Sequence, residues 1–214
     1  MIKPFYKFPS FEDLVDLNSS LKAVFFDMDG TLLHTEPLHE KVFVKMGEDY
    51  KITPPNETIP LMTGLSDQQV YNLTKSWPGF PPNLSEVQFI EEKNHRMLKM
   101  IPSIQTSTIM MDNCVQLLRD LRKNKMITGL VTSSEKIITE ALLQHVELMP
   151  FFDFIITRQD VINPKPDPQA YLLALEKSGK NINQCLVFED SIPGIQAAQF
   201  HGLLIGKALW WEKA

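Results

Sequence analysis

The chain alternates short apolar runs with amphipathic helical patterns over most of its length. Five runs have the length and the β-branched or aromatic character of buried strands, at residues 21–27, 126–132, 152–157, 185–188 and 203–206. The stretches between them repeat apolar side chains every three or four positions, as amphipathic helices do, at residues 111–123, 135–147 and 168–178. Strands that alternate with helices predict an α/β fold with a Rossmann-like parallel sheet and helices on both faces.

One long segment interrupts this alternation. Residues 37–104 contain three helical patterns, at 38–50, 66–77 and 85–100, which are separated by proline-rich stretches and include no convincing strand pattern. The sequence therefore predicts a discontinuous α/β core domain, residues 1–36 and 105–214, with an all-helical domain inserted at 37–104.

Composition and charge narrow the classes of partner. A chain of 214 residues has room for one medium domain with a smaller insert, and its net charge is −5 with 21 scattered Lys and Arg residues. Nothing here is typical of a nucleic-acid or membrane partner, so we expect a small-molecule partner and a monomer or weak dimer. Trp210 and Trp211 are consistent either with an oligomer contact or with packing onto the sheet edge.

The cysteines and the first residues bear on the compartment. Cys114 and Cys185 lie in apolar contexts without a second cysteine or histidine at metal-ligand spacing, so neither a disulfide framework nor a zinc site is expected. The first residues lack the apolar core of a signal peptide, and no apolar stretch approaches the ~18 residues of a membrane span. We therefore expect a cytoplasmic protein.

Polar side chains follow four of the predicted strands at the point where each strand ends. In a parallel sheet the carboxyl ends of the strands share one edge, where ligands bind. The residues that this rule brings together are Asp27, Asp29, Thr132, Ser133, Ser134, Lys165, Glu189 and Asp190. Four carboxylates, three hydroxyl groups and one ammonium group are thus predicted to share a rim.

This set of groups suits phosphoryl transfer. Asp27 and Asp29 are two residues apart, so on an extended chain they address the same substrate. Several adjacent carboxylates need a counter-charge, and Mg²⁺ is a hard cation that binds carboxylates and bridges to phosphate. Hydroxyl and backbone N–H groups near Thr132 can hold phosphate oxygens, and Lys165 can offset the remaining negative charge.

Four short motifs give the sequence a family resemblance. "DMDGTL", "VTSS", "KPDP" and "VFEDS" stand in the order and spacing of the four motifs of the haloacid dehalogenase-like (HAD) superfamily. "HTEPLH" and "FEDSIPGIQAA" resemble its β-phosphoglucomutase-like subgroup, and residues 37–104 look like its helical C1 cap. The resemblance spans roughly residues 21–206 and implies a HAD-like core.

The resemblance also implies roles for individual residues. Asp27 matches the nucleophile that forms an aspartyl-phosphate, and Asp29 matches the general acid and base. Lys165 matches the charge-neutralising lysine. The phosphate-binding position falls on Thr132 with Ser133 beside it, and the Mg²⁺ ligands fall on Asp27, the Asp29 carbonyl and Asp190, with Glu189 acting through water or behind the ligands.

The substrate side of the resemblance is less uniform. His39, Lys93 and Asn94 match positions that organise the sugar phosphate in the mutases of the subgroup. The alternative interpretations are a surface histidine for His39 and a solvated helix face for Lys93 and Asn94. Asp67 stands where the mutases have an arginine, and an acid there would repel a second phosphate. His34 is a further departure, since the family often has aspartate at that position.

The resulting expectation is a Mg²⁺-dependent phosphatase that hydrolyses a small phosphorylated metabolite, such as a sugar phosphate, through an aspartyl-phosphate. A phosphosugar mutase and a non-catalytic phosphometabolite-binding protein remain the alternatives. A non-catalytic binding protein would be expected to have a damaged motif, whereas all four motifs are intact in this sequence.

Overall fold

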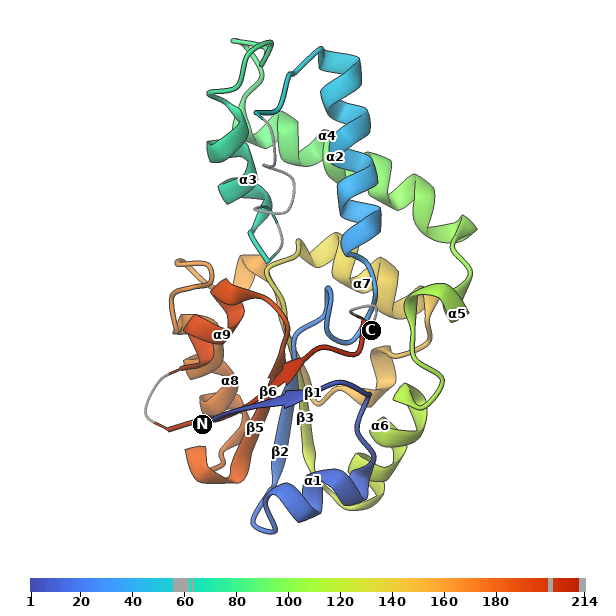
Figure 1. Cartoon of the computed structure of the whole chain (residues 1–214), viewed down its shortest axis with the longest axis vertical. Helices are drawn as coiled ribbons and strands as arrows, with labels where there is room; N and C mark the ends of the chain where they lie inside the picture. Colours follow the sequence, from blue (N-terminus) through green and yellow to red (C-terminus); the bar gives the residue numbers. More distant parts are fainter. Residues whose placement is uncertain (56–61, 63, 200–201, 212–214) are drawn as a thin grey trace.

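The computed structural model describes residues 1–55, 62, 64–199 and 202–211. Its centre is a six-stranded sheet in the order β1-β6-β5-β2-β3-β4, in which every neighbouring pair is parallel (Figure 1). The strands are β1 (Ile2–Phe5), β2 (Ala23–Phe26), β3 (Ile127–Val131), β4 (Phe154–Ile156), β5 (Cys185–Glu189) and β6 (Leu204–Ala208). The predicted α/β class with a parallel sheet is confirmed.

Alternate residues of the central strands pack into two separate cores. On β2, Val24 and Phe26 face one core, whereas Ala23 and Phe25 face the other. The first core is covered by α1 (Phe11–Leu17), α6 (Cys114–Lys123) and α7 (Lys136–His145), and the second by α8 (Gln169–Ser178) and α9 (Ile192–Ala198). Burial on both faces explains why these strands read as continuous apolar runs.

Three further helices stand beyond the carboxyl ends of the strands (Figure 1). They are α2 (Glu36–Tyr50), α3 (Asp67–Thr74) and α4 (Glu86–Met100), and we call them the helical layer. Ser66 and Ser85 begin α3 and α4, each with a side chain that accepts from the backbone three residues later. The chain then returns through η2 (Ile101–Ser103) and α5 (Thr106–Ile109), and the described residues between β2 and β3 form no strand. Residues 56–60 of the proline-rich stretch lie outside the described residues.

Two elements near the N-terminus are absent from the sequence prediction. β1 pairs with β6 at the sheet edge, and α1 begins with a capping box between Ser10 and Asp13. Lys3 and Pro4 interrupt the apolar pattern of β1, whose residues are mostly exposed. An exposed edge strand has no buried face to leave a pattern in the sequence, so its pairing comes from β6.

The chain ends against the core. The Trp210 ring is 7% exposed and packs edge-on against Phe8 and Phe188. The indole groups of Trp210 and Trp211 both donate to the backbone oxygen of Thr31, at 2.9 and 3.1 Å. Both side chains thus pack against their own chain, as the second sequence interpretation expected, although their contacts within the described residues are with Phe8, Phe188 of β5 and the Thr31 turn and not with the edge strand.

The state of the cysteines and the apolar character of the helices bear on two of the expectations from the sequence. Cys114 and Cys185 are both buried and free. None of the helices in the described parts of the chain combines the length and the apolar character needed to cross a membrane.

Candidate active site

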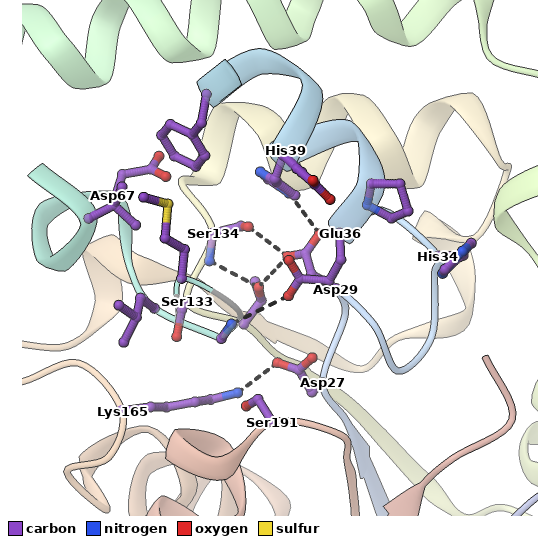
Figure 2. A pocket seen from close by; sticks show the side chains of 18 residues that line it. Asp27, Asp29, His34, Glu36, His39, Asp67, Ser133, Ser134, Lys165 and Ser191 are labelled. Carbon is purple, nitrogen blue, oxygen red and sulfur yellow. Dashed lines mark hydrogen bonds and ion pairs between the residues drawn. The ribbon is translucent and has the colours of Figure 1, made fainter. Parts of the chain in front are cut away.

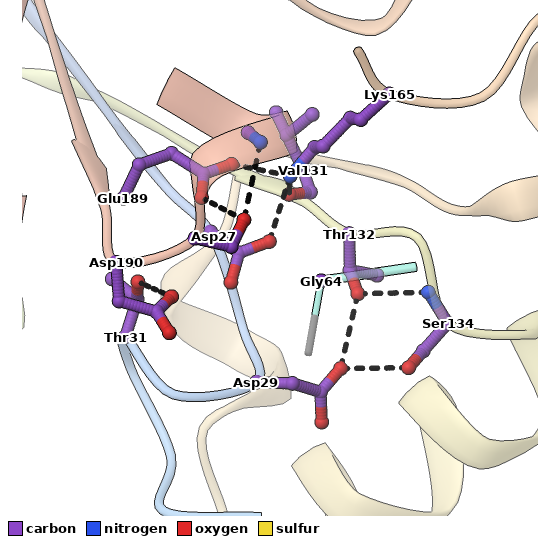
Figure 3. A network of polar contacts seen from close by, with 12 residues as sticks. Asp27, Asp29, Thr31, Gly64, Val131, Thr132, Ser134, Lys165, Glu189 and Asp190 are labelled. Atoms are coloured by element: carbon purple, nitrogen blue, oxygen red, sulfur yellow. Dashed lines mark hydrogen bonds and ion pairs between the residues drawn. The ribbon is translucent and has the colours of Figure 1, made fainter. Parts of the chain in front are cut away.

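Lys165 links the carboxylates at the ends of β2 and β5. Its ammonium donates to Oδ1 of Asp27 at 2.7 Å, to Oε1 of Glu189 at 2.5 Å and to the backbone oxygen of Val131 at 2.9 Å (Figure 3). All three charged side chains are buried, with Lys165 only 3% exposed. Three acceptors satisfy the three donors of the ammonium group, so Lys165 fixes Asp27 against the end of the sheet.

Burial and the opposite charge act in opposite directions on the pKa values of Asp27 and Lys165. Burial, followed by the Glu189 carboxylate, raises the pKa of Asp27 well above its usual range, and the Lys165 ammonium opposes this rise. Burial alone would lower the pKa of Lys165, but Asp27 and Glu189 raise it overall. Lys165 therefore stays charged and supplies the counter-charge that two adjacent buried carboxylates require.

A second group of contacts forms around Asp190. Thr31 donates from its hydroxyl to Oδ1 of Asp190 at 2.8 Å (Figure 3). Gly30 has φ +77°, and a Cβ atom there would fall 2.2 Å from Oδ2 of Asp190, so glycine satisfies both the turn and the close approach. Burial and the Glu189 carboxylate raise the pKa of Asp190 to about 8.

Asp27, Glu189 and Asp190 form a donor set for a cation. One carboxylate oxygen from each lies within 4.8 Å of the others. Three carboxylate oxygens suit a hard divalent cation, and such a cation would lower the raised pKa values of Asp27 and Asp190. Asp29, the fourth predicted metal residue, is not in this cluster of side chains.

Asp29 is held by four donors that approach from two sides. Thr35 and His39 contact Oδ1 at 2.5 and 3.0 Å, and Thr132 and Ser134 contact Oδ2 at 3.3 and 2.6 Å. Burial raises the pKa of Asp29, but the His39 imidazole and the hydroxyl groups of Ser134 and Thr35 lower it overall, to well below its usual value. In this arrangement Asp29 is ionised, with both carboxylate oxygens held by hydrogen bonds.

The three hydroxyl groups after β3 are not used alike. Thr132 and Ser134 donate to Asp29, and the backbone N–H of Ser134 donates to the Thr132 hydroxyl at 3.0 Å. The Oγ atom of Ser133 is buried and has no hydrogen-bond partner among the described residues. A buried hydroxyl without a partner is costly, so Ser133 is suited to bind a ligand oxygen.

Several of the polar side chains described above line a cavity of about 330 Å³ between the sheet and the helical layer (Figure 2). Its floor consists of Asp27, Asp29, Thr132, Ser133, Ser134 and Lys165. The rest of its lining, which we call the helical end, includes Glu36, Glu40, Phe43, Asp67 and Val70 from α2 and α3, and Glu36 lies beside Asp29 where the two parts meet. The volume lies at the small end of the ~300–1,000 Å³ that is usual for ligand pockets.

The helical layer touches the core beside this cavity. Gln69 donates from its amide to the backbone oxygen of Lys165 at 3.0 Å, and Arg158 donates to the Gln68 amide oxygen at 2.9 Å. A Cβ atom at Gly64, which has φ +75°, would fall 2.4 Å from Cβ of Ser191. The helical layer therefore closes over the floor in this structure.

His39 and Lys93 lie in surroundings that differ from the surface interpretations. His39 is 9% exposed and contacts Asp29, so it is not a surface histidine. Lys93 is fully buried and its ammonium lies 2.9 Å from Oδ2 of Asp67, so it is not part of a solvated helix face. It is not among the residues that line the cavity.

Asn94 is the last of the predicted substrate residues, and His34 is the departure from the family pattern noted in the sequence. The Oδ1 atom of Asn94 is buried and has no hydrogen-bond partner within the described part of the chain, and the residue does not line the cavity. The His34 ring stacks on the indole of Trp211 at 4.8 Å and borders the cavity, and burial lowers the pKa of His34.

Several residues of the site escape sequence reasoning. Thr31 and Thr35 hold Asp190 and Asp29, and Tyr171 on α8 donates its hydroxyl to Glu189. Thr31 belongs to the first motif, "DMDGTL", and Thr35 follows that motif by three residues, so their closeness to the two aspartates in the sequence offers a clue. Tyr171 and the Trp210–Trp211 pair reach the site through tertiary contacts that no local pattern reports.

Comparison with protein families and with curated proteins adds an independent finding. The sequence model of the haloacid dehalogenase-like hydrolase family matches residues 21–202. The fructose-1-phosphate phosphatase YqaB of Escherichia coli K12 is 30% identical over 184 residues, which cover 85% of this chain and 93% of that protein. The probable pseudouridine-5'-phosphatase of Drosophila melanogaster is 31% identical over 186 residues, which cover 84% and 78% of the two chains.

Solved structures share the arrangement of sheet and helices. CbbY of Rhodobacter sphaeroides in complex with phosphate has a TM-score of 0.76 at 23% identity, covering 86% of this chain and 84% of that one. A β-phosphoglucomutase from Clostridium difficile has a TM-score of 0.73 at 25% identity, covering 83% and 79%. The first of these likenesses concerns the fold alone.

Proposed function

The chain belongs to the haloacid dehalogenase-like hydrolases and is a phosphoric monoester hydrolase, and on this premise we propose that it is a Mg²⁺-dependent phosphatase. Its substrate is a small phosphorylated metabolite of the sugar-phosphate kind, and the reaction passes through an aspartyl-phosphate on Asp27. The observation that carries the proposal is the position of Asp27, fixed by Lys165 at 2.7 Å on the floor of the cavity.

In the first step Asp27 acts as the nucleophile. A carboxylate oxygen of Asp27 forms a bond to phosphorus, and the bond between phosphorus and the ester oxygen breaks. Thr132, Ser133 and neighbouring backbone N–H groups hold the phosphoryl oxygens, while Lys165 offsets the added negative charge. The departing oxygen takes up a proton from the Asp29–His39 pair, whose polar atoms lie 3.0 Å apart.

In the second step water replaces the alcohol. Asp29 accepts a proton from the water, which forms a bond to phosphorus as the bond to Asp27 breaks. The lowered pKa keeps Asp29 ionised before this step, and it also makes the carboxylate a weak base, so the hydrogen bonds that lower it must loosen as the proton arrives. For the first step the proton comes to the Asp29–His39 pair from solvent, and His39 is a positioning residue that keeps Asp29 directed at the cavity.

The metal is assigned to the donor set already described. Asp27 and Asp190 would hold Mg²⁺ together with the Asp29 carbonyl, and Glu189 would support them from behind, since it already accepts from Lys165 and Tyr171. When bound there, Mg²⁺ neutralises charge on the phosphate and on the carboxylates.

We assign the substrate-covering role to residues 37–104, as a helical cap domain inserted into the core at 1–36 and 105–214. The contacts of Gln68 and Gln69 with Arg158 and Lys165 are few and polar, which suits a segment that opens and closes with each turnover. Closure would exclude water during the first step.

A phosphate-release assay on a panel of phosphomonoesters, with and without Mg²⁺, tests the proposal. Release that depends on Mg²⁺ and disappears in Asp27→Asn supports it. A phosphosugar mutase would instead interconvert glucose 1-phosphate and glucose 6-phosphate with a bisphosphate activator. Mutase turnover faster than phosphate release would overturn the assignment as a phosphatase.

A further inference from the structure

The two ends of the cavity differ in what they offer a ligand. The floor presents hydroxyl groups and Lys165, which suit a phosphoryl group. The helical end presents three carboxylates, from Glu36, Glu40 and Asp67, beside apolar surface from Phe43 and Val70. Whatever is attached to the phosphoryl group must lie against this second surface.

No cation at the helical end is available to a second anionic group. Lys165 is the only lysine or arginine among the described residues that line the cavity, and its three donors already contact oxygen atoms of Asp27, Glu189 and Val131. Of the two described histidines that line the cavity, His39 contacts the Asp29 carboxylate, and His34 stacks on Trp211, where burial lowers the pKa of His34. A second phosphate or a carboxylate would therefore lack a partner.

The Asp67–Lys93 pair is oriented with its negative end toward the cavity. Asp67 lines the cavity, whereas Lys93 does not, and their polar atoms are 2.9 Å apart. Lys93 is 0% exposed, so its ammonium group pairs with Asp67 and cannot contact a substrate directly. The cavity consequently faces a carboxylate whose counter-charge lies behind it.

Two further acids beside the cavity have raised pKa values, each because of burial and a different neighbouring carboxylate. Burial and Asp67 raise the pKa of Glu135, and burial and Asp29 raise the pKa of Glu36. Glu36 accepts a hydrogen bond from the backbone N–H of Gly64 at 3.4 Å, which fixes its side chain at the helical end. Carboxylates accept hydrogen bonds from hydroxyl and ammonium groups and repel other anions.

We propose that this site selects monophosphate esters of uncharged or positively charged hydroxylated alcohols and rejects esters that carry a second phosphate or a carboxylate. The proposal rests on the proposed phosphatase function and adds the charge of the leaving alcohol to it. Hydroxyl or amino groups of the alcohol donate to Glu36, Glu40 and Asp67, and its carbon skeleton lies against Phe43 and Val70. Asp67 and Lys93 thereby act as specificity-determining residues.

Matched substrates measure this selection in the unmodified protein. Sorbitol 6-phosphate and 6-phosphogluconate are both open six-carbon chains, and they differ in a terminal hydroxyl group against a carboxylate. We expect kcat/KM to be about 100-fold higher for sorbitol 6-phosphate. Glucosamine 6-phosphate should be turned over at least as well as glucose 6-phosphate, and fructose 1-phosphate far better than fructose 1,6-bisphosphate.

A charge series at Asp67 and Lys93 tests the source of the selection. The preference for sorbitol 6-phosphate over 6-phosphogluconate should rise in Lys93→Met, fall in the double variant Asp67→Asn with Lys93→Met, and fall furthest in Asp67→Asn. Glu91→Gln removes an exposed charge from the same helix α4, outside the cavity, and should leave the preference unchanged. Circular dichroism and thermal melting identify any variant that fails to fold. In that case the matched substrates, measured on the unmodified protein, still test the selection.

The outcomes separate the two proposals. Efficient hydrolysis of 6-phosphogluconate or of bisphosphates by the unmodified protein, alongside neutral esters, would overturn the selection and leave the phosphatase function standing. A selection that is present but indifferent to the charge series would overturn the role of Asp67 and Lys93. Failure to release phosphate from any ester with Mg²⁺ would overturn the phosphatase function and the selection with it.

Discussion

Lys165 and Lys93 are both buried lysines that pair with an aspartate. Lys165 lies on the floor of the cavity, whereas Lys93 lies behind Asp67 in the helical layer. Lys165 donates to two carboxylates and a backbone oxygen on the floor, and its ammonium also lies 5.1 Å from the Tyr171 ring. Within the described part of the chain, Lys93 has one carboxylate partner, Asp67, and both lie in the segment that we propose as the cap (residues 37–104). The floor is thus a connected network, whereas the cap holds an isolated pair.

The difference separates two tasks. In a connected network each group restrains several others, so the floor keeps one geometry whichever ester is bound. An isolated pair can be changed without disturbing the reacting atoms, so the cap can alter the field around the alcohol. The chemistry is accordingly expected to be sensitive to changes on the floor, and the choice of substrate to changes in the cap.

The largest effect is expected from Asp27→Asn. The amide cannot attack phosphorus, so kcat/KM should fall by about 10⁴-fold or more while the far-UV circular dichroism spectrum stays unchanged. Asp16→Asn removes an exposed carboxylate of α1 and serves as the control, with unchanged activity. Turnover in Asp27→Asn close to that of the control would rule out Asp27 as the nucleophile.

The two buried lysines allow a direct test of the comparison. Lys165→Met should lower kcat/KM by about 10³-fold, because it removes both a charge beside phosphate and the restraint on Asp27. Lys93→Met should lower activity on neutral esters by less than about 10-fold. Each leaves a buried carboxylate unpaired, so urea unfolding should report a loss of about 3 kcal/mol or more in both. Equal losses of activity would remove the distinction between floor and cap.

The floor should also be the part that responds to pH and metal. The pKa of Asp190 is about 8 in the folded, metal-free protein, far above its value in the unfolded chain. A raised pKa means that the folded state retains a proton that the unfolded state has lost, so this stabilisation is complete below about pH 4 and is lost as the pH rises toward about 8. Melting temperatures of the metal-free protein should therefore fall across this window.

Mg²⁺ should reverse that trend. Binding requires the ionised carboxylates, so the increase in melting temperature on adding Mg²⁺ should be larger near pH 8 than near pH 6. Asp190→Asn, which removes the titrating group, should reduce both the pH trend and the effect of Mg²⁺. A Mg²⁺ effect that is independent of pH would contradict the donor set of Asp27, Glu189 and Asp190.

The smallest effect is expected from Trp211→Phe. Phenylalanine keeps a ring that can stack on His34 but removes the indole N–H that donates to Thr31, so the free energy of unfolding should fall by about 1 kcal/mol. Because Thr31 donates to Asp190, the Mg²⁺ concentration for half-maximal activity should rise a few-fold, and the preference among esters should not change. A changed preference would place Trp211 on the cap side of the comparison.

The floor was largely predictable from the sequence because most of its residues directly follow buried strands, and Lys165 lies in the connection after β4. The order of the apolar runs fixes where a parallel sheet ends, and Asp27, Lys165 and Asp190 stand at those ends. The partners of Asp29 were not predictable. They depend on the side-chain rotamers of Thr35 and Ser134, which neither spacing nor composition specifies.

The cap was predictable as helices but not as a source of charge. Phe89, Lys93 and Met97 are four residues apart on α4 and all are buried, so Lys93 lies within the apolar stripe of its helix. A lysine within such a stripe is typical of a buried ion pair, and this pattern was available in the sequence. Its partner Asp67 lies on another helix, and no local pattern identifies it.

The contacts that close the cap over the floor have a consequence for ionic strength. Gln69 donates from a neutral amide to a backbone oxygen, and the guanidinium of Arg158 donates to the neutral amide oxygen of Gln68. Neither of these two contacts joins two opposite charges, so dissolved salt has little to screen in them. A salt dependence of cap closure or of turnover should therefore arise at the His39–Asp29 contact between cap and core, or at the charged floor.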